Sequence, residues 1–171
     1  MIAKLFEIKT TKNKGKGLFA KEQIPKGTIV WYGCSKCKII SEKEFNKMSK
    51  NEKIDFLEHA YRRKDGSFLE PCDEAKFLNH SCNSNILDTG KGFDIAVRNI
   101  KKGEEATYDY RVFYDDLNMP CSCGEVNCCK IVTCKHPAPK ELEQFWSKKI
   151  NSAFKLLNKV SQPLKINRRY Q

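Results

Sequence analysis

The chain has 171 residues, of which 40% are hydrophobic, so it can bury a real core and is not an intrinsically disordered protein. It holds no run of about eighteen apolar residues and no signal-peptide pattern, so we expect neither a membrane span nor secretion. The formal net charge of +11 fits simple solubility or an affinity for nucleic acid.

The nine cysteines predict an intracellular protein with a metal site. Five of them fall between residues 121 and 134, and in a reducing compartment such clustering favours a metal over disulfides. We therefore expect a nuclear location if the source is eukaryotic. A microbial source would make the protein cytoplasmic or deliver it to a host cell.

The first half of the chain reads as strands followed by two helices. Residues 2–10 and 28–32 carry the apolar, β-branched and aromatic residues of strands. Ser41 and Ser49 each precede a Glu three residues later, which is the capping-box signal for a helix start. We expect two short helices that reach about residue 62.

The second half combines a strand, a cysteine-rich stretch and a final helix. Residues 93–100 are strand-like, whereas residues 111–134 show little periodicity. A helical stripe follows, which we expect to pack on its own domain, formed by Leu142, Trp146, Ile150, Ala153, Leu157 and Val160.

Four motifs occur in a specific order. They are Gly-Lys-Gly-Leu-Phe-Ala at 15–20, Lys-Phe-Leu-Asn-His-Ser-Cys-Asn-Ser-Asn at 76–85, Gly-Glu-Glu-Ala-Thr-Tyr-Asp-Tyr at 103–110, and a CxCx4C from Cys121 to Cys128. Together they resemble the SET-domain protein-lysine methyltransferases with a zinc-binding post-SET segment. The resemblance covers roughly residues 1–131.

The resemblance implies a mainly β fold with short helices, made of several small curved sheets and a knotted-looking threaded segment. It divides the chain into a SET domain at 1–118, with a helical insert at about 42–62, and a post-SET zinc segment at 119–134. A C-terminal helix and basic tail follow at 135–171.

The implied function is methyl transfer from S-adenosylmethionine to a lysine of a basic protein such as a histone. The attacking amine must be neutral, although a free lysine has a pKa of about 10.4. The site must therefore desolvate the amine in a narrow, aromatic channel and align it with the donor.

The resemblance assigns a role to each tyrosine of the third motif. Tyr110 is the implied catalytic residue, and the hydroxyl of Tyr108 narrows the channel, which predicts mono- or dimethylation. Tyr61 is a further channel candidate, or else a core aromatic of a helix. Trp31 stands where the family often has a tyrosine, unless the register slips by one residue and Tyr32 lines the channel.

The same resemblance implies the donor-binding and zinc residues. Ser84 departs from the usual proline, and Leu18 from a frequent tryptophan. The expected donor-binding residues are Lys16, Gly17, Leu18, Asn79, His80, Tyr110 and Ile131. The expected zinc ligands, which complete a tetrahedron of thiolates, are Cys82, Cys121, Cys123 and Cys128.

Other readings of the chain stay open. Cys34 and Cys37 form a lone CxxC, and we do not expect Cys72 to complete a set with them. Acidic clusters at 65–74 and 104–116 flank the motifs and suit a basic substrate. The alternatives to an enzyme are a catalytically silent SET-like module that binds a basic tail, and a zinc-stabilised nucleic-acid-binding protein.

Overall fold

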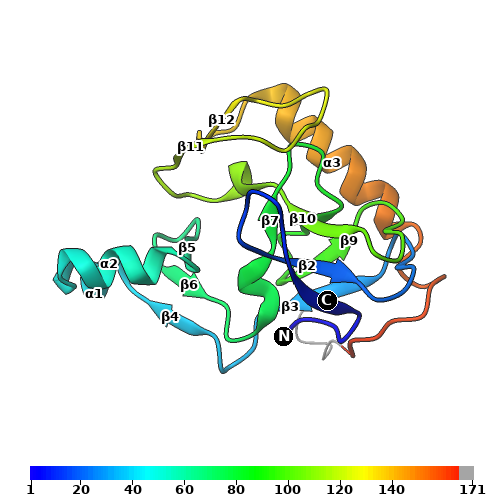
Figure 1. The fold of residues 1–171 in the computed structure, drawn as a ribbon, viewed down its shortest axis with the longest axis horizontal. Coiled ribbons are helices and arrows are strands. Elements are labelled where there is room, and N and C mark those ends of the chain that lie inside the picture. Colours follow the sequence, from blue (N-terminus) through cyan, green and yellow to red (C-terminus); the bar gives the residue numbers. More distant parts are fainter. Residues whose placement is uncertain (166–171) are drawn as a thin grey trace.

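The computed structural model describes residues 1–165 as four small sheets and a few short helices (Figure 1). The expected mainly β class is confirmed. Arg168 and Arg169 of the expected basic tail lie outside the described residues. No helix in the described part is long and apolar enough to cross a membrane.

The largest sheet joins the first three motifs. Its strand order is β1 (Phe6–Thr10), β2 (Lys16–Ala20), β10 (Glu105–Tyr108) and β7 (Asn79–His80). Strands β10 and β7 run parallel, which places Asn79 beside Thr107 and His80 beside Tyr108. Segments about thirty residues apart in the chain therefore meet edge to edge at the expected site.

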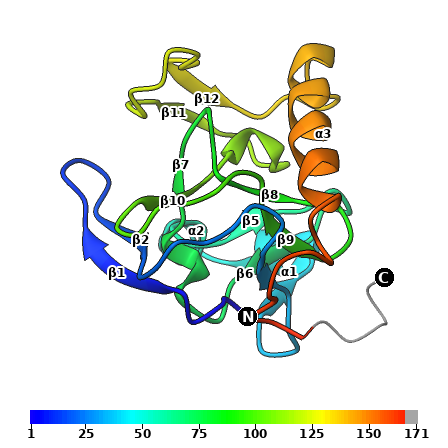
Figure 2. The same ribbon diagram turned by 90° about the vertical axis from the view of Figure 1, so that its right-hand side faces the viewer.

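A second sheet carries the C-terminal helix. It consists of β3 (Ile29–Tyr32), β9 (Phe93–Ala96) and β8 (Ile86–Asp88), and α3 (Lys140–Phe154) lies along it (Figure 2). The helical face packs on Leu87, Phe93 and Ile95 through Trp146 and Ile150, among others. The expected packing of the stripe on its own domain is confirmed, although α3 ends at Phe154, before Leu157 and Val160.

The insert forms an arm that projects to one side in Figure 1. It combines α1 (Glu42–Lys47) and α2 (Lys50–Leu57) with the strands β4 (Lys38–Ile40), β5 (Tyr61–Arg62) and β6 (Phe68–Glu70). Both capping boxes are present. The expected helical reach to residue 62 is wrong, because α2 ends at Leu57 and Tyr61 pairs with Leu69 as a strand residue.

The remaining elements are short. The first strand begins at Phe6 rather than at residue 2, because Ile2 instead forms an isolated bridge with Trp31. The strand near residue 93 ends at Ala96. Two 3-10 turns and one hairpin complete the described elements. They are η1 (Glu74–Phe77), η2 (Tyr110–Val112) and the hairpin strands β11 (Asn118–Pro120) and β12 (Ile131–Thr133).

Gly27 fixes how closely the end of α3 approaches the sheet. Its φ is +94°, and an added Cβ would lie 2.8 Å from Leu156 Cβ and 3.1 Å from the Ala153 carbonyl.

We expect Gly27→Ala to lower the free energy of unfolding by about 2–4 kcal/mol, from backbone strain plus overlap. Gly90→Ala is the matched control, because Gly90 also has a positive φ but has no atom within 4 Å of an added Cβ. Its expected cost is about 1 kcal/mol. Chemical denaturation measures both, and equal costs would contradict the close approach.

Candidate functional site

Tyr110 begins the turn η2 one residue after β10 ends, and two hydrogen bonds position it. Its hydroxyl donates to the Leu78 carbonyl at 2.7 Å, and its backbone N–H donates to His80 Nδ1 at 3.1 Å. Burial, and then the charge of Glu105, raises the pKa of Tyr110 to about 12. The phenol is therefore neutral at physiological pH, so it can orient a reactant by hydrogen bonding but does not act as a base.

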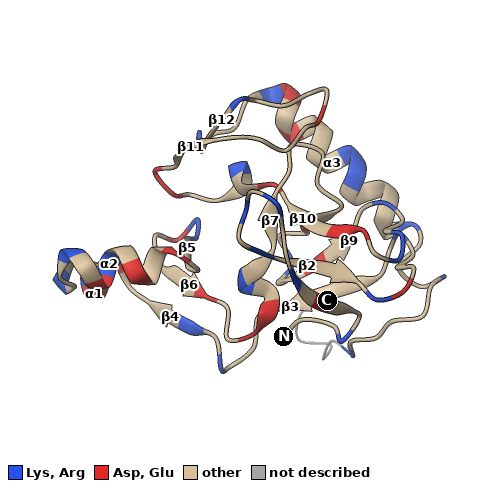
Figure 3. Ribbon diagram, viewed as in Figure 1, with Lys and Arg blue, Asp and Glu red and all other residues tan. Residues whose placement is uncertain are grey.

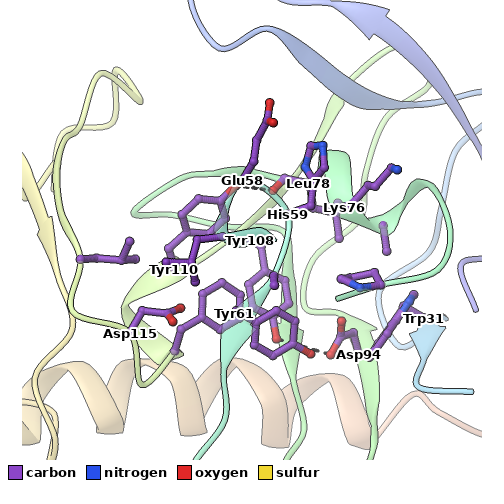
Figure 4. A pocket seen from close by; sticks show the side chains of 16 residues that line it. Trp31, Glu58, His59, Tyr61, Lys76, Leu78, Asp94, Tyr108, Tyr110 and Asp115 are labelled. Carbon is purple, nitrogen blue, oxygen red and sulfur yellow. Dashed lines mark hydrogen bonds between the residues drawn. The ribbon is translucent and has the colours of Figure 1, made fainter. Parts of the chain in front are cut away.

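A cavity of about 130 Å³ opens beside this hydroxyl. Figure 4 shows Tyr61, Tyr108 and Tyr110 on its wall, with Trp31 and Asp94 at one end. The ring of Phe113 stacks on Tyr61 at 4.4 Å and on Tyr108 at 5.4 Å between centroids. This part of the lining is thus aromatic and closely packed, which suits the apolar stem of a long side chain.

A broader groove of about 1110 Å³ meets this cavity. The two hollows share one wall, made of Trp31, Tyr61, Asp94, Tyr108 and Phe113. The outer side of the groove is formed partly by α3, through Glu143, Trp146 and Ile150. The groove and the cavity therefore lie on either side of one largely aromatic wall.

Tyr108 is buried at the junction, and its hydroxyl donates to Asp94 Oδ1 at 3.4 Å. Burial raises the pKa of Asp94 well above its usual value, and the neighbouring Asp88 adds to this. Burial, followed by the charge of Asp94, also raises the pKa of Tyr108. The pair therefore forms a polar point in an otherwise aromatic wall.

The residues of the first and second motifs meet tightly. Asn79 Nδ2 donates to the Lys16 carbonyl and to Glu105 Oε1, both at 2.9 Å. A Cβ on Gly17 would fall 3.0 Å from Asn79 Nδ2 and 2.9 Å from Glu105 Oε1. A side chain at position 17 would displace the ends of Asn79 and Glu105, so Gly17 allows them to approach β2 closely.

His80 links the tyrosine to the cysteines. Its Nδ1 accepts the Tyr110 N–H, so the proton of the neutral ring sits on Nε2, which lies 3.4 Å from Cys82 Sγ. Burial lowers the pKa of His80 to about 4, which keeps the ring neutral at pH 7. From the sequence, His80 was expected only to contact the methyl donor. Its side chain also connects Tyr110 to Cys82.

The remaining residues expected at the site differ in whether their side chains are buried, exposed or part of the cavity wall. Trp31 lines both hollows, whereas Tyr32 packs with the α3 cluster, which decides the register between them. The Leu18 side chain is fully buried in the main core, so only its backbone is free for a ligand. Ile131 is exposed on β12, and Lys16 is exposed with its ammonium 5.3 Å from the Phe77 ring.

Three thiols of the fourth motif gather with Cys82 of the second, the set that the family resemblance implies. The sulfurs of Cys82, Cys121, Cys123 and Cys128 all lie within 4.8 Å of one another. A tetrahedral zinc with bonds of about 2.3 Å separates its sulfurs by about 3.8 Å. The Cys82–Cys121 distance is 3.8 Å. The residues therefore fit zinc.

An overlapping set competes for the same ion. His80, Cys82, Cys121 and Cys129 are also within reach of one another. The His80 ring is unsuited to it, because Nε2 carries the proton when Nδ1 accepts the Tyr110 N–H. In addition, the Cys129 N–H donates to Cys82 Sγ at 3.3 Å and the Lys130 N–H to Cys128 Sγ at 3.5 Å. Such bonds stabilise thiolates, and the second favours the four-cysteine set, because Cys128 belongs to that set alone.

A buried carboxylate holds the region together. Asp109 has no exposed surface and accepts from Arg111 Nε at 2.8 Å and from Arg111 Nη2 at 2.7 Å. It also accepts from the Trp146 indole N–H at 2.9 Å, which ties α3 to the turn that carries Tyr110.

The acidic cluster at 104–116 is partly neutralised within the chain. Glu104 pairs with Arg98, Glu105 with Lys14, and Asp109 with Arg111. Acidic and basic residues accordingly alternate over much of the ribbon (Figure 3). Asp115, which lines the cavity, has its pKa raised to about 6, chiefly by burial.

Two residues of the cavity wall were not expected from the sequence. Asp94 could have been noticed as a lone acid inside the apolar strand at 93–97. Phe113 carried no pattern that separates it from an ordinary loop aromatic. Its position depends on how η2 turns after Tyr110.

A second group of thiols is present near the insert. The sulfurs of Cys34, Cys37 and Cys72 lie within 4.8 Å of one another. The expectation that Cys72 does not join the CxxC is wrong, because the end of β6 returns beside the end of β3.

The comparisons with known proteins agree with this geometry. The SET domain family model matches residues 15–111. The chain is also similar in sequence to histone-lysine N-methyltransferases that are described as H3 lysine-36 specific. The one from Debaryomyces hansenii is 36% identical over 133 residues (70% of this chain, 18% of the relative), and the one from Candida albicans 31% over 135 residues (71% and 16%). This chain therefore spans less than a fifth of those relatives.

Two solved structures share the fold. KRYPTONITE, crystallised with mCHG DNA and SAH, gives a TM-score of 0.57 at 22% identity, covering 74% of this chain and 28% of that one. The methyltransferase domain of human SETMAR gives 0.55 at 24% identity, covering 76% and 58%. Since the family model spans more than half of the residues and the sheets agree, this chain belongs to the SET-domain family.

Proposed function

We propose that the protein is an S-adenosylmethionine-dependent protein-lysine N-methyltransferase. The observation that carries the proposal is the Tyr110 hydroxyl, held by the Leu78 carbonyl at one side of an aromatic cavity. The Gly17–Asn79 contact joins β2 to β7, the two strands that flank β10 in the same sheet. Bound S-adenosylmethionine supplies an electrophilic methyl group, and the chain supplies alignment.

Three features of the chain prepare the amine. The aromatic, desolvated cavity disfavours an ammonium and so favours the neutral nucleophile. The neutral Tyr110 hydroxyl and the Leu78 carbonyl place oxygen atoms where the reacting nitrogen and methyl meet. The stacked rings of Tyr61, Phe113 and Tyr108 restrict the lysine stem to one direction.

The substrate class follows from the relatives' names. The similar enzymes are described as specific for H3 lysine-36, so a histone H3 tail is the first substrate to test, and a nuclear location goes with it in a eukaryote. A silent binding module would have no use for a hydroxyl oriented as in Tyr110. Nucleic-acid contact through the basic surface stays a prediction.

The cysteines of the post-SET segment support a zinc role. Zinc held by Cys121, Cys123 and Cys128 together with Cys82 would fasten residues 119–134 to the strand that carries Asn79 and His80. The exposed Ile131 is then held close to the site, where it can cover a bound donor.

Replacing Tyr110 by Phe tests the proposal most directly. We expect turnover with histone H3 to fall about 100-fold or more, because the orienting hydroxyl is lost. Donor affinity, measured by calorimetry, should stay nearly unchanged, because the ring remains. If methylation of H3 by the wild-type enzyme disappears when lysine-36 of H3 is replaced by arginine, that lysine is the methylated residue. Equal rates for the two enzymes would overturn the role of Tyr110.

Replacing Tyr108 by Phe tests the control of product. Without the hydroxyl bonded to Asp94, the cavity gains room, and we expect the main product to change from mono- or dimethyl-lysine to trimethyl-lysine in a mass-spectrometric time course. Tyr32→Phe is the control, because Tyr32 packs against the α3 cluster and should leave the product unchanged. An unaltered product from Tyr108→Phe would contradict the prediction.

Replacing Cys123 by Ser tests the zinc site. The variant should contain about one equivalent of zinc less than the wild type and bind donor more weakly, since the post-SET segment loses its anchor. Cys134→Ser is the control, because Cys134 belongs to neither set of ligands described above. Metal analysis that shows no difference between Cys123→Ser and the wild type would exclude this site.

A further inference from the structure

We infer that Cys34, Cys37 and Cys72 form a second site for a thiophilic metal ion, zinc in the first instance, at the base of the insert. This inference does not depend on the proposed methyltransferase activity. Nor does it depend on the post-SET cysteines, which lie in a different part of the fold.

The distances between the sulfurs suit one ion. Cys34 and Cys37 are 3.9 Å apart, Cys34 and Cys72 3.5 Å, and Cys37 and Cys72 3.7 Å. Their mean is close to the separation of about 3.8 Å that tetrahedral zinc imposes on its thiolates. The post-SET pair Cys82–Cys121 shows the same spacing at 3.8 Å. A disulfide would instead require about 2.05 Å, and all three thiols are free.

The backbone around the first two thiols resembles a metal-binding turn. The Cys37 N–H donates to the Cys34 carbonyl at 3.0 Å, which closes the Cys-x-x-Cys into a tight turn with both sulfurs on one side.

The three protein ligands leave one position for a solvent ligand. Within residues 1–165, no further His, Cys, Asp or Glu lies within the same mutual distance of all three sulfurs. The Cys72 side of the site is exposed, whereas Cys37 is buried against the main core. A metal would therefore be anchored from the core side and reachable from water.

The position gives the site a structural role. Cys34 and Cys37 lie between β3 and β4, where the chain enters the insert, and Cys72 follows β6, where it leaves. One ion would thus close the loop of residues 38–71 at its base. The same segments carry Trp31 and Pro71, which line the cavity, so the ion would also fix the insert side of the channel.

Zinc analysis of the wild type and four variants tests the inference. We expect about two equivalents per chain in the wild type, about one in Cys72→Ser, about one in Cys123→Ser, and none in the double variant. Cys134→Ser should match the wild type. The contrary result is a wild type that holds about one equivalent of zinc, which Cys72→Ser retains and Cys123→Ser loses. It would overturn the second site and leave the post-SET site intact.

A measurement on the wild type covers the case in which Cys72→Ser fails to fold. Alkylation of the native protein, read by peptide mass spectrometry, should leave the peptides of Cys34, Cys37 and Cys72 protected until a chelator is added. Cobalt(II) exchanged into Cys123→Ser should still give a thiolate charge-transfer band. Free alkylation before chelation would overturn the inference. A disulfide between Cys34 and Cys72 would also overturn it. Such a bond would make the denatured protein two hydrogens lighter than the fully reduced chain, and peptide mapping would locate it.

Discussion

The buried carboxylate of Asp109 is the interaction on which the site depends. With no exposed surface, it needs compensation for the loss of water, and it obtains this from the two guanidinium contacts of Arg111 and the indole N–H of Trp146. The first partner fixes the turn η2 and the second fixes α3. Removing either partner would leave a charge that the interior cannot solvate.

Tyr110 owes its position to the same centre. It follows Asp109 directly, and its N–H is taken by His80, whose other nitrogen faces Cys82. The parallel pairing of β7 with β10 makes this possible, because it sets His80 beside Tyr108 at the sheet edge. A proposed zinc ion, a histidine and a tyrosine are thereby connected in one chain of contacts.

Small sheets and irregular segments explain why thiol clusters recur in this fold. Strands of two to five residues bury little area, so the hairpin β11–β12 and the insert cannot be held by sheet packing alone. One set of thiols lies where the hairpin meets the body, and the other where the insert leaves it. The aromatic cavity lies between elements that these two sets would hold.

The family, the mainly β class, the two capped helices and the post-SET thiols could all be predicted from the amino-acid sequence, because each is encoded by a local pattern or by recognisable motifs. The other features depend on how the chain folds in three dimensions. Trp31 rather than Tyr32 faces the cavity because of the bulge in β3, and Tyr61 is a strand residue because β6 pairs with it. Asp94, Phe113 and the union of Cys72 with Cys34 and Cys37 depend on contacts between segments distant in the chain. Such contacts leave no periodic trace in the sequence, since they arise only when separate strands are brought together.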